Sequence, residues 1–331
     1  MFDSVDVDFI GRATLGLYHR HIATEAGGLE AIPSQESLVK TMFVYTDADY
    51  LQLKELNLNT LNLDGLRANK SFFYKTEIAK LSAKYISMKG ASMYQSRLPN
   101  ACFSGGDLTD LNVERSLLTE ACFTDTILDG VNMNMTDLRW ADFSGCDLDG
   151  VTINNSRLFG AELKNTNLSG ANLDGCIFSR QSDDDKDHLG LEGIDFTGCL
   201  LNDADFNSVV ANGVDFTWAE LLEANFEEAK LNKADFTDVL ASGANFSLSS
   251  MQEAVFLGAS LDHADFSEAT CLKACFFEAK MAGALLTNSD FSEADFTKAD
   301  LRGADFTGSN ITGANFTDAN LENAIFDTKP L

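Results

Sequence analysis

The sequence predicts an all-β fold in which short extended segments coil around one apolar core. An apolar residue recurs every five positions, with a small residue two places before it, as in Ala304-Asp305-Phe306. This frame runs without a break from Leu191 to Phe326, and a second frame, offset by three, covers Leu53 to Phe178. Together the two frames contain 54 repeats in a chain of 331 residues. A period of five excludes a helix, because such a stripe rotates steadily around a surface with 3.6 residues per turn.

Each five-residue unit predicts a short strand followed by a corner. Side chains alternate along a strand, so the small residue and the apolar centre both point inward, and the residue between them occupies an outward position. The two residues after the centre, the first and second corner positions, must turn the chain. Glycine at the second corner position suits a tight turn with unusual dihedral angles. The predicted corner glycines are Gly105, Gly130, Gly145, Gly150, Gly170, Gly193 and Gly303.

The repeat resembles that of the pentapeptide repeat family, whose pattern is seen in Ala141-Asp142-Phe143-Ser144-Gly145. The resemblance implies a right-handed, four-sided (quadrilateral) parallel β-helix with four repeats in each coil. Phenylalanine centres recur every ten residues from Phe196 to Phe276, as an even number of sides allows. At about 4.8 Å per coil, the repeats predict about 13 coils and a rod about 65 Å long.

Two interruptions divide the predicted solenoid. Between Phe178 and Leu191 lie twelve residues where four are expected, which predicts a solvated acidic loop that is either a tolerated insertion or a binding loop. At the N-terminus, Pro33-Ser34 followed by Glu36 and apolar residues predicts a partly helical cap. The expected organisation is a cap at 1–50, a first half of the β-helix at 51–180, the loop at 181–188, an acidic second half at 189–328 and a tail at 329–331.

The repeats continue almost to the C-terminus, which predicts an open last coil. Each coil of a solenoid buries its core only against its neighbours, so an end coil needs a cover. A second copy is the simplest cover, and we predict a homodimer through this coil. Its inward residues are Ile311, Phe316, Leu321 and Phe326.

The composition is strongly acidic, with 51 acidic and 24 basic residues and a net charge of -27. Such a surface repels nucleic acids and anionic membranes and attracts basic partners. The sequence holds no apolar run of the length that spans a membrane. Asp3, Asp6 and Asp8 are unlike the basic start of a secretory signal. We predict a cytoplasmic protein, with export by an uncleaved route left open.

Catalysis finds little support, and we predict no enzymatic activity, no cofactor and no metal site. No nucleophile stands beside an ordered base, and the histidines are scattered; they are His19, His21, His188 and His263. Seven cysteines without a CxxC pair argue against a disulfide framework or a zinc site. Cys102 and Cys122 are expected to stack on an outer face and to stay reduced in a cytoplasm. Four others occupy inward positions and are expected in the core: Cys146, Cys176, Cys199 and Cys271.

Charge is distributed unevenly along the chain. Residues 67–97 are basic, with Glu77 their one acid, and Tyr74 and Tyr94 are expected to stack there; the basic residues are Arg67, Lys70, Lys75, Lys80, Lys84, Lys89 and Arg97. Residues 189–328 hold 24 acidic and six basic residues, a net of -18. Over their predicted length of about 34 Å, a DNA duplex would carry about 20 charges. The acidic half is therefore a candidate DNA mimic, although the repeat itself supplies nine of these acids as outward aspartates.

Two functions fit this surface. One is a DNA mimic that binds a DNA-handling enzyme. The chain resembles the quinolone-resistance branch of the family, whose acidic rods bind DNA gyrase as tail-to-tail dimers, so DNA gyrase or topoisomerase IV is the implied partner. The alternative is a scaffold or secreted effector with a protein partner unrelated to DNA. The acidic half is not expected to bind nucleic acid. The candidate partner-binding acids are Asp183, Asp184, Asp185, Asp187, Glu220, Glu223, Glu227, Glu228, Asp238, Asp265, Glu268 and Glu293.

A group of outward apolar residues is a further candidate contact site. Centres Phe256 and Phe276 are twenty residues apart, so they are expected on one face of consecutive coils. Isolated surface hydrophobes are unremarkable, whereas a stacked patch marks a contact site. The patch either docks a partner or second copy, or packs locally. Its residues are Val255, Leu257, Leu272, Cys275 and Phe277.

Overall fold

The computed structural model describes residues 49–55, 57–58, 60–168, 170–179, 190–191 and 194–327. The chain forms two compact units, Met1–Asp147 and Leu148–Leu331. The predicted loop 181–188 and tail 329–331 lie outside the described residues, as does nearly all of the predicted cap. The division of the β-helix at the loop therefore stays a prediction.

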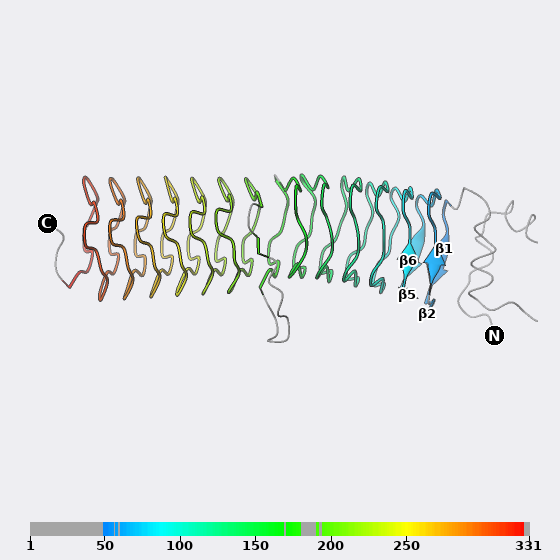
Figure 1. Ribbon diagram of the computed structural model, residues 1–331, viewed down its shortest axis with the longest axis horizontal. Coiled ribbons are helices and arrows are strands. Elements are labelled where there is room, and N and C mark those ends of the chain that lie inside the picture. The colour runs from blue at the N-terminus through cyan, green and yellow to red at the C-terminus, as the bar shows by residue number, and fades with distance from the viewer. Residues whose placement is uncertain are drawn as a thin grey trace, which may run out of the picture. The chain divides into compact units, whose positions relative to one another are not determined.

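Six short strands open the described part of the first unit (Figure 1). They are β1 Gln52–Lys54, β2 Asn57–Leu58, β3 Leu61–Asn62, β4 Phe72–Tyr74, β5 Glu77–Ile78 and β6 Leu81–Ser82. Strand β1 pairs with β4, β2 with β5 and β3 with β6, all in parallel. Partners are twenty residues apart, as in Leu53 and Phe73. Since five residues form one side, twenty residues form a coil of four sides.

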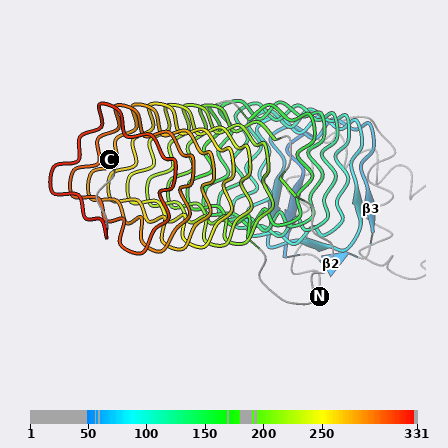
Figure 2. The same cartoon turned by 60° about the vertical axis from the view of Figure 1, so that its left-hand side comes forward.

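The same register continues as isolated parallel bridges in both units. Cys102 pairs with Cys122 in the first unit, and Asp195 pairs with Asp215 in the second. Figures 1 and 2 show the coils of the second unit, green to red, lying one upon another. The fold is a right-handed, four-sided parallel β-helix with four repeats per coil, as predicted.

The corners place their second residue in the left-handed region. Gly303 has a φ of 68°, and all the other predicted corner glycines except Gly193, which lies outside the described residues, also have positive φ. Many corners lack glycine, and Trp218 and Glu223 adopt φ values of 60° and 55° there. A residue with a Cβ pays roughly 1 kcal/mol for this conformation. The coil therefore requires a left-handed backbone at this position. Glycine adopts it most easily, but other residues also occur there.

Phenylalanine rings fill the core of the second unit. The Phe236 side chain is fully buried, and its ring lies parallel to those of Phe216 and Phe256 at centroid distances of 4.9 and 4.7 Å. It meets the rings of Phe226 and Phe246, ten residues away, edge-on at 5.8 and 5.6 Å. Offset-parallel and edge-on contacts at these distances are favourable. The ten-residue phenylalanine period thus corresponds to two columns of rings that meet edge to face.

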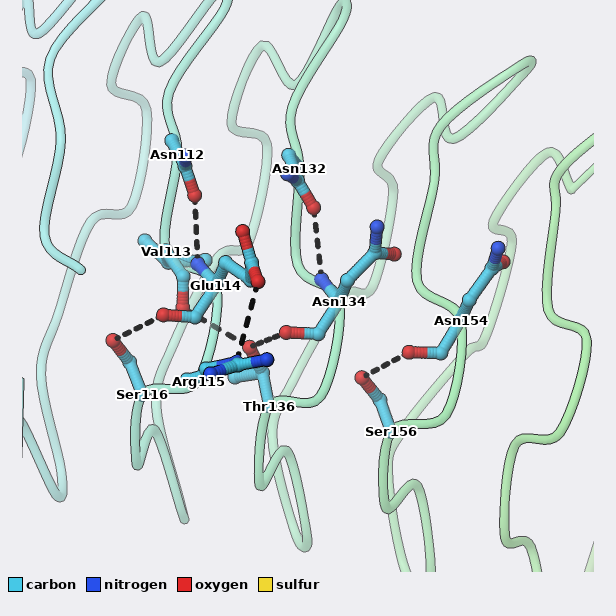
Figure 3. A network of polar contacts seen from close by, with 10 residues as sticks. All are labelled: Asn112, Val113, Glu114, Arg115, Ser116, Asn132, Asn134, Thr136, Asn154 and Ser156. Atoms are coloured by element: carbon cyan, nitrogen blue, oxygen red, sulfur yellow. Dashed lines mark hydrogen bonds and ion pairs between the residues drawn. The ribbon is translucent and has the colours of Figure 1, made fainter. Parts of the chain in front are cut away.

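Buried hydroxyl groups replace alanine at some small inward positions (Figure 3). The Ser116 hydroxyl donates to the backbone carbonyl of Met93 at 2.6 Å, and that of Thr136 donates to Val113 at 3.0 Å. Each acceptor belongs to the preceding coil. A buried polar group must be hydrogen-bonded to be tolerated, and these bonds satisfy it.

The eight extra residues between Phe178 and Leu191 leave the register of the coils intact. Asn172 pairs with Leu200, and Ile177 pairs with Asp205, both at a separation of 28 residues. Phe178 stacks on Phe206 with a centroid distance of 4.6 Å, as other rings do at a separation of twenty. The insertion therefore adds length to the chain without displacing the next coil.

Candidate interaction surfaces

The outward aspartates of the second unit hold its corners together. The Asp235 carboxylate accepts a hydrogen bond from the backbone N–H of Thr237 at 2.9 Å, and Asn225 and Asn245 accept the same bond through their amide oxygens. Such bonds are typical of Asx turns and explain why the repeat admits either residue. All nine outward aspartates make this bond: Asp195, Asp205, Asp215, Asp235, Asp265, Asp290, Asp295, Asp300 and Asp305.

The other candidate acids divide by position. Those at second corner positions are exposed: Glu223, Glu228, Asp238, Glu268 and Glu293. Glu220 is outward, and Glu227 is at a first corner; both are half-buried. The Glu227 and Glu228 carboxylates accept hydrogen bonds from Asn207 and Ser208 in the preceding coil. Asp183, Asp184, Asp185 and Asp187 lie outside the described residues.

Ion pairs neutralise part of the acidic surface. Glu293 lies 3.5 Å from Lys273, Glu253 lies 3.7 Å from Lys233, and each pair joins corners of successive coils. Lys298 pairs in the same way with Glu278 at 2.9 Å. Exposed pairs of this kind add little stability, but they cancel charge locally. Glu293 therefore contributes less to an anionic surface than its exposure alone indicates.

Unbalanced negative charge is concentrated at residues 199–228, which we call the acidic band. It holds seven carboxylates and no lysine or arginine. Four of the candidate residues, Glu220, Glu223, Glu227 and Glu228, belong to a single coil of this band. They lie on two successive sides of the coil and on the corners that follow these sides.

The predicted apolar patch is only partly open. Val255 and Cys275 pair across neighbouring coils and are half-buried, and the Leu257 side chain is 39% exposed. Phe277 is half-buried, and the Lys298 ammonium lies 5.1 Å from its ring centroid. Leu272, at the corner on the other side of the same face, is also half-buried. The residues come together as expected, and a cation covers the largest of them.

A more exposed apolar surface surrounds Glu220 and was not identified from the sequence. Glu220 lies between Leu200 and Leu240, its bridge partners in the coils before and after. Trp218 and Leu222 occupy the corners on either side of it. The exposed fractions of Trp218, Leu222 and Leu240 are 64%, 41% and 45%. We call these five residues the Trp218 surface; applying the outward and corner rule to every repeat would have found it.

The basic aromatic surface, at the start of the described first unit, consists of Lys54, Phe72, Tyr74, Lys75 and Tyr94. The ring of Tyr74 is parallel to that of Tyr94 at 6.3 Å, as predicted, and lies 6.0 Å from that of Phe72. The Lys54 ammonium lies 5.8 Å from the Phe72 centroid, and that of Lys75 lies 5.0 Å from the Tyr74 centroid. These are cation–π distances.

The last described coil has an open edge. Phe316 and Leu321 are half-buried, whereas Phe296 and Leu301, one coil earlier, are fully buried. Ile311 and Phe326 are also half-buried. Within the described residues, the backbone N–H groups of Ile311, Phe316 and Leu321 have no acceptor, although Phe296 donates to Asn315 in the interior. The coil therefore presents apolar side chains and unpaired backbone donors together.

The cysteines agree with their predicted places. Cys146, Cys176, Cys199 and Cys271 are buried, and Cys102 and Cys122 stack on an outward face as free thiols. Burial raises the pKa of Cys146 to about 11 and that of Cys176 to about 12. In the part of the chain that the structure describes, no three potential ligands gather around a metal position, and no helix could cross a membrane.

Comparison with known proteins found a match to a protein-family model described as pentapeptide repeats, in eight copies. The matched residues are 107–145, 141–180, 191–227, 219–256, 242–283, 274–313 and 289–327. They cover more than half of the chain. A search of curated proteins found no match.

Among the solved structures that are similar to this chain, two are described as pentapeptide repeat proteins and one as a fluoroquinolone resistance protein. HetL, involved in heterocyst differentiation regulation in the cyanobacterium Nostoc sp. strain PCC 7120, is 22% identical over 93% of this chain and 95% of its own, with a TM-score of 0.21. A protein of the Arabidopsis thaliana thylakoid lumen is 30% identical over 34% and 68%, with a TM-score of 0.25. QnrB1, a plasmid-mediated fluoroquinolone resistance protein, is 23% identical over 56% and 77%, with a TM-score of 0.24.

Proposed function

Because this chain belongs to the pentapeptide repeat family, we propose that it is a non-catalytic binding protein whose acidic band binds a basic protein surface. The observation that carries the proposal is the acidic band, with seven carboxylates and no lysine or arginine in 30 residues. These residues amount to about one and a half coils, or about 7 Å, where a DNA duplex would carry about four charges. The band therefore offers a DNA-binding protein at least the charge density of its substrate.

The partner class that fits best is an enzyme that binds DNA, and DNA gyrase and topoisomerase IV are the first to test. Charge beyond the band is reduced by the pairs of Lys233, Lys273 and Lys298. The outward aspartates already accept hydrogen bonds from the backbone N–H groups of the corners. Mimicry is therefore confined to the acidic band and Asp238, and does not involve the whole acidic half. Glu268 and the loop acids are secondary contributors in this proposal.

A pair of matched variants tests whether the band or the total charge is recognised. The first replaces Glu220, Glu223, Glu227 and Glu228 with glutamine. The second replaces four outward aspartates with asparagine, which retains the corner hydrogen bond and removes the same charge: Asp235, Asp290, Asp295 and Asp305. Binding to immobilised gyrase and topoisomerase IV is measured at low and high salt, with and without competing duplex DNA.

We expect the glutamine variant to lose at least about tenfold in affinity and the asparagine variant to stay close to wild type. Salt and duplex DNA should both weaken the wild-type complex, because screening shortens the field and DNA occupies the same site. Equal affinities of the glutamine variant and the wild type would contradict recognition through the acidic band.

A scaffold or effector role with a partner unrelated to DNA is the second candidate, because DNA has no counterpart to the apolar patch at Leu257 and Phe277. Replacing both residues with serine should leave the coil folded and remove binding of such a partner. A gyrase complex that survives this change but not the glutamine change favours the DNA mimic. The reverse pattern favours the scaffold.

A further inference from the structure

The two units carry surfaces of opposite charge that both display apolar groups. Between Tyr50 and Arg97 the sequence holds eight basic and three acidic residues, whereas the acidic band holds seven acidic residues and no lysine or arginine. The basic residues lie among phenylalanine and tyrosine rings, and the acidic residues lie among a tryptophan and leucines. A surface that combines exposed apolar groups with one sign of charge marks a contact site for a partner of the opposite sign.

The basic aromatic surface presents its cations at the outside. The ammonium groups of Lys54 and Lys75 lie over the rings of Phe72 and Tyr74. A hydrogen bond with Tyr74 raises the pKa of Lys75, and this side chain is charged at neutral pH, as an ordinary lysine is. A carboxylate can approach either ammonium from solvent without displacing it from its ring. A nucleic-acid base would have to displace it in order to stack, so this arrangement favours carboxylates over bases.

The Trp218 surface has the complementary form. The Glu220 carboxylate lies at its centre, the exposed Glu223 lies beside Leu222, and the Trp218 indole N–H is 3.4 Å from the Asp238 carboxylate. Glu220 and Glu223, which belong to the acidic band, have no lysine or arginine within six residues in the sequence. Tryptophan is among the residues most often found at the energetic centre of protein interfaces. The surface thus offers an exposed ring, flanking leucines and unbalanced negative charge.

We propose that the basic aromatic surface of one copy binds the Trp218 surface of a second copy. Lys54 and Lys75 pair with Glu220 and Glu223, while Trp218 packs against the ring of Tyr94, over which no ammonium lies in the described residues. The chain's charge of -27 opposes any association of two copies. A contact between the most basic surface of one copy and an acidic surface of the other provides the local attraction that best offsets this repulsion. The proposal is independent of any DNA-binding partner.

The repeat itself shows that charge reversals are tolerated at these positions. Lys280 occupies the same outward column as Glu220. In this column Glu220 pairs with Leu240, Leu240 pairs with Ser260, and Ser260 pairs with Lys280. Lys233 adopts at a second corner position the left-handed conformation that Glu223 adopts. Glutamate likewise occupies the positions of Lys54 and Lys75 elsewhere in the helix. Loss of association in the variants can therefore be separated from loss of folding.

The experiment uses two full-length variants, Lys54→Glu with Lys75→Glu, and Glu220→Lys with Glu223→Lys. Sedimentation velocity is measured for the wild type, for each variant and for an equimolar mixture of the two, all carrying Phe326→Glu so that no contact through the last described coil contributes. We expect each variant alone to self-associate at least about tenfold more weakly than the wild type, and the mixture to form a heterocomplex that restores association. A variant with Lys80→Glu and Lys84→Glu makes an equal charge change off the surface and should associate like the wild type.

Three results would overturn the proposal: a wild type that does not associate, a mixture that fails to restore association, or a control that loses as much as the lysine variant. Binding of a fluorescent single-stranded oligonucleotide is measured in parallel. Oligonucleotide binding that depends on Lys54 and Lys75, with unchanged self-association, would assign the surface to nucleic acid instead. Trp218→Ala supplies a test without a charge change, and it should weaken wild-type association and leave the melting temperature within a few degrees of wild type.

Discussion

At the scale of single residues, the second corner position carries much of the surface chemistry. Its backbone is left-handed, which costs a residue with a Cβ roughly 1 kcal/mol relative to glycine. Trp218, Glu223 and Lys75 accept this conformation and are exposed there. A non-glycine side chain at this position is therefore displayed to solvent at a cost in backbone stability.

The cysteines provide a residue-scale test of the inward register. Cys146, Cys176, Cys199 and Cys271 are buried, whereas Cys102, Cys122 and Cys275 are partly exposed. The thiolate is the reactive form, so the buried thiols should resist modification in the native state. We expect a chromogenic disulfide reagent at pH 8 to titrate three thiols rapidly and the remaining four only after denaturation. Rapid reaction of all seven in the native protein would contradict the register.

Element by element, the periodicity predicted the coil and its four sides, because each repeat packs against its neighbour twenty residues away. The Trp218 surface was harder to see. Trp218, Leu222 and Leu240 occupy three different positions of the repeat, and they become neighbours only once the coils are stacked. The ion pair of Lys273 with Glu293 likewise joins residues twenty apart. The predicted cap has no period from which packing can be derived.

The ring columns give an element-scale prediction. Phe236→Asp places a charge between four rings in a fully buried position, and it should destabilise the coil by at least about 4 kcal/mol. Thr237→Asp makes the same substitution at the adjacent half-buried corner and should cost less than about 1 kcal/mol. Thermal melting followed by circular dichroism compares the two. Similar melting temperatures would mean that the inward and outward positions have been exchanged.

At the scale of the whole molecule, we propose that a second copy covers the last described coil. The coil presents the half-buried Phe316 and Leu321 and, within the described residues, their unpaired backbone N–H groups together with the unpaired carbonyls of Ala314 and Ala319. An identical open coil therefore offers both apolar surface and hydrogen-bond partners. This contact differs from that between the two charged surfaces, because it is apolar and insensitive to exchange of charges.

Phe326→Glu should abolish this contact, because it places a charge where the two coils meet. Ile325→Glu is the matched control, since Ile325 is outward and 52% exposed. Light scattering at micromolar concentration should give a lower mass for the Phe326 variant than for the Ile325 variant, with both still folded. Equal masses for the two variants and the wild type would exclude an interface at this coil.

The unchanged register across the insertion has a consequence for engineering. Ile177 and Asp205 are paired although 28 residues separate them, so the coil after the insertion keeps its register with eight residues added before it. Length is therefore free to vary at this corner while the ring columns on either side continue. A foreign peptide, an epitope or a fluorescent reporter grafted between Phe178 and Leu191 should be displayed by a scaffold whose geometry is already fixed on both sides of the graft.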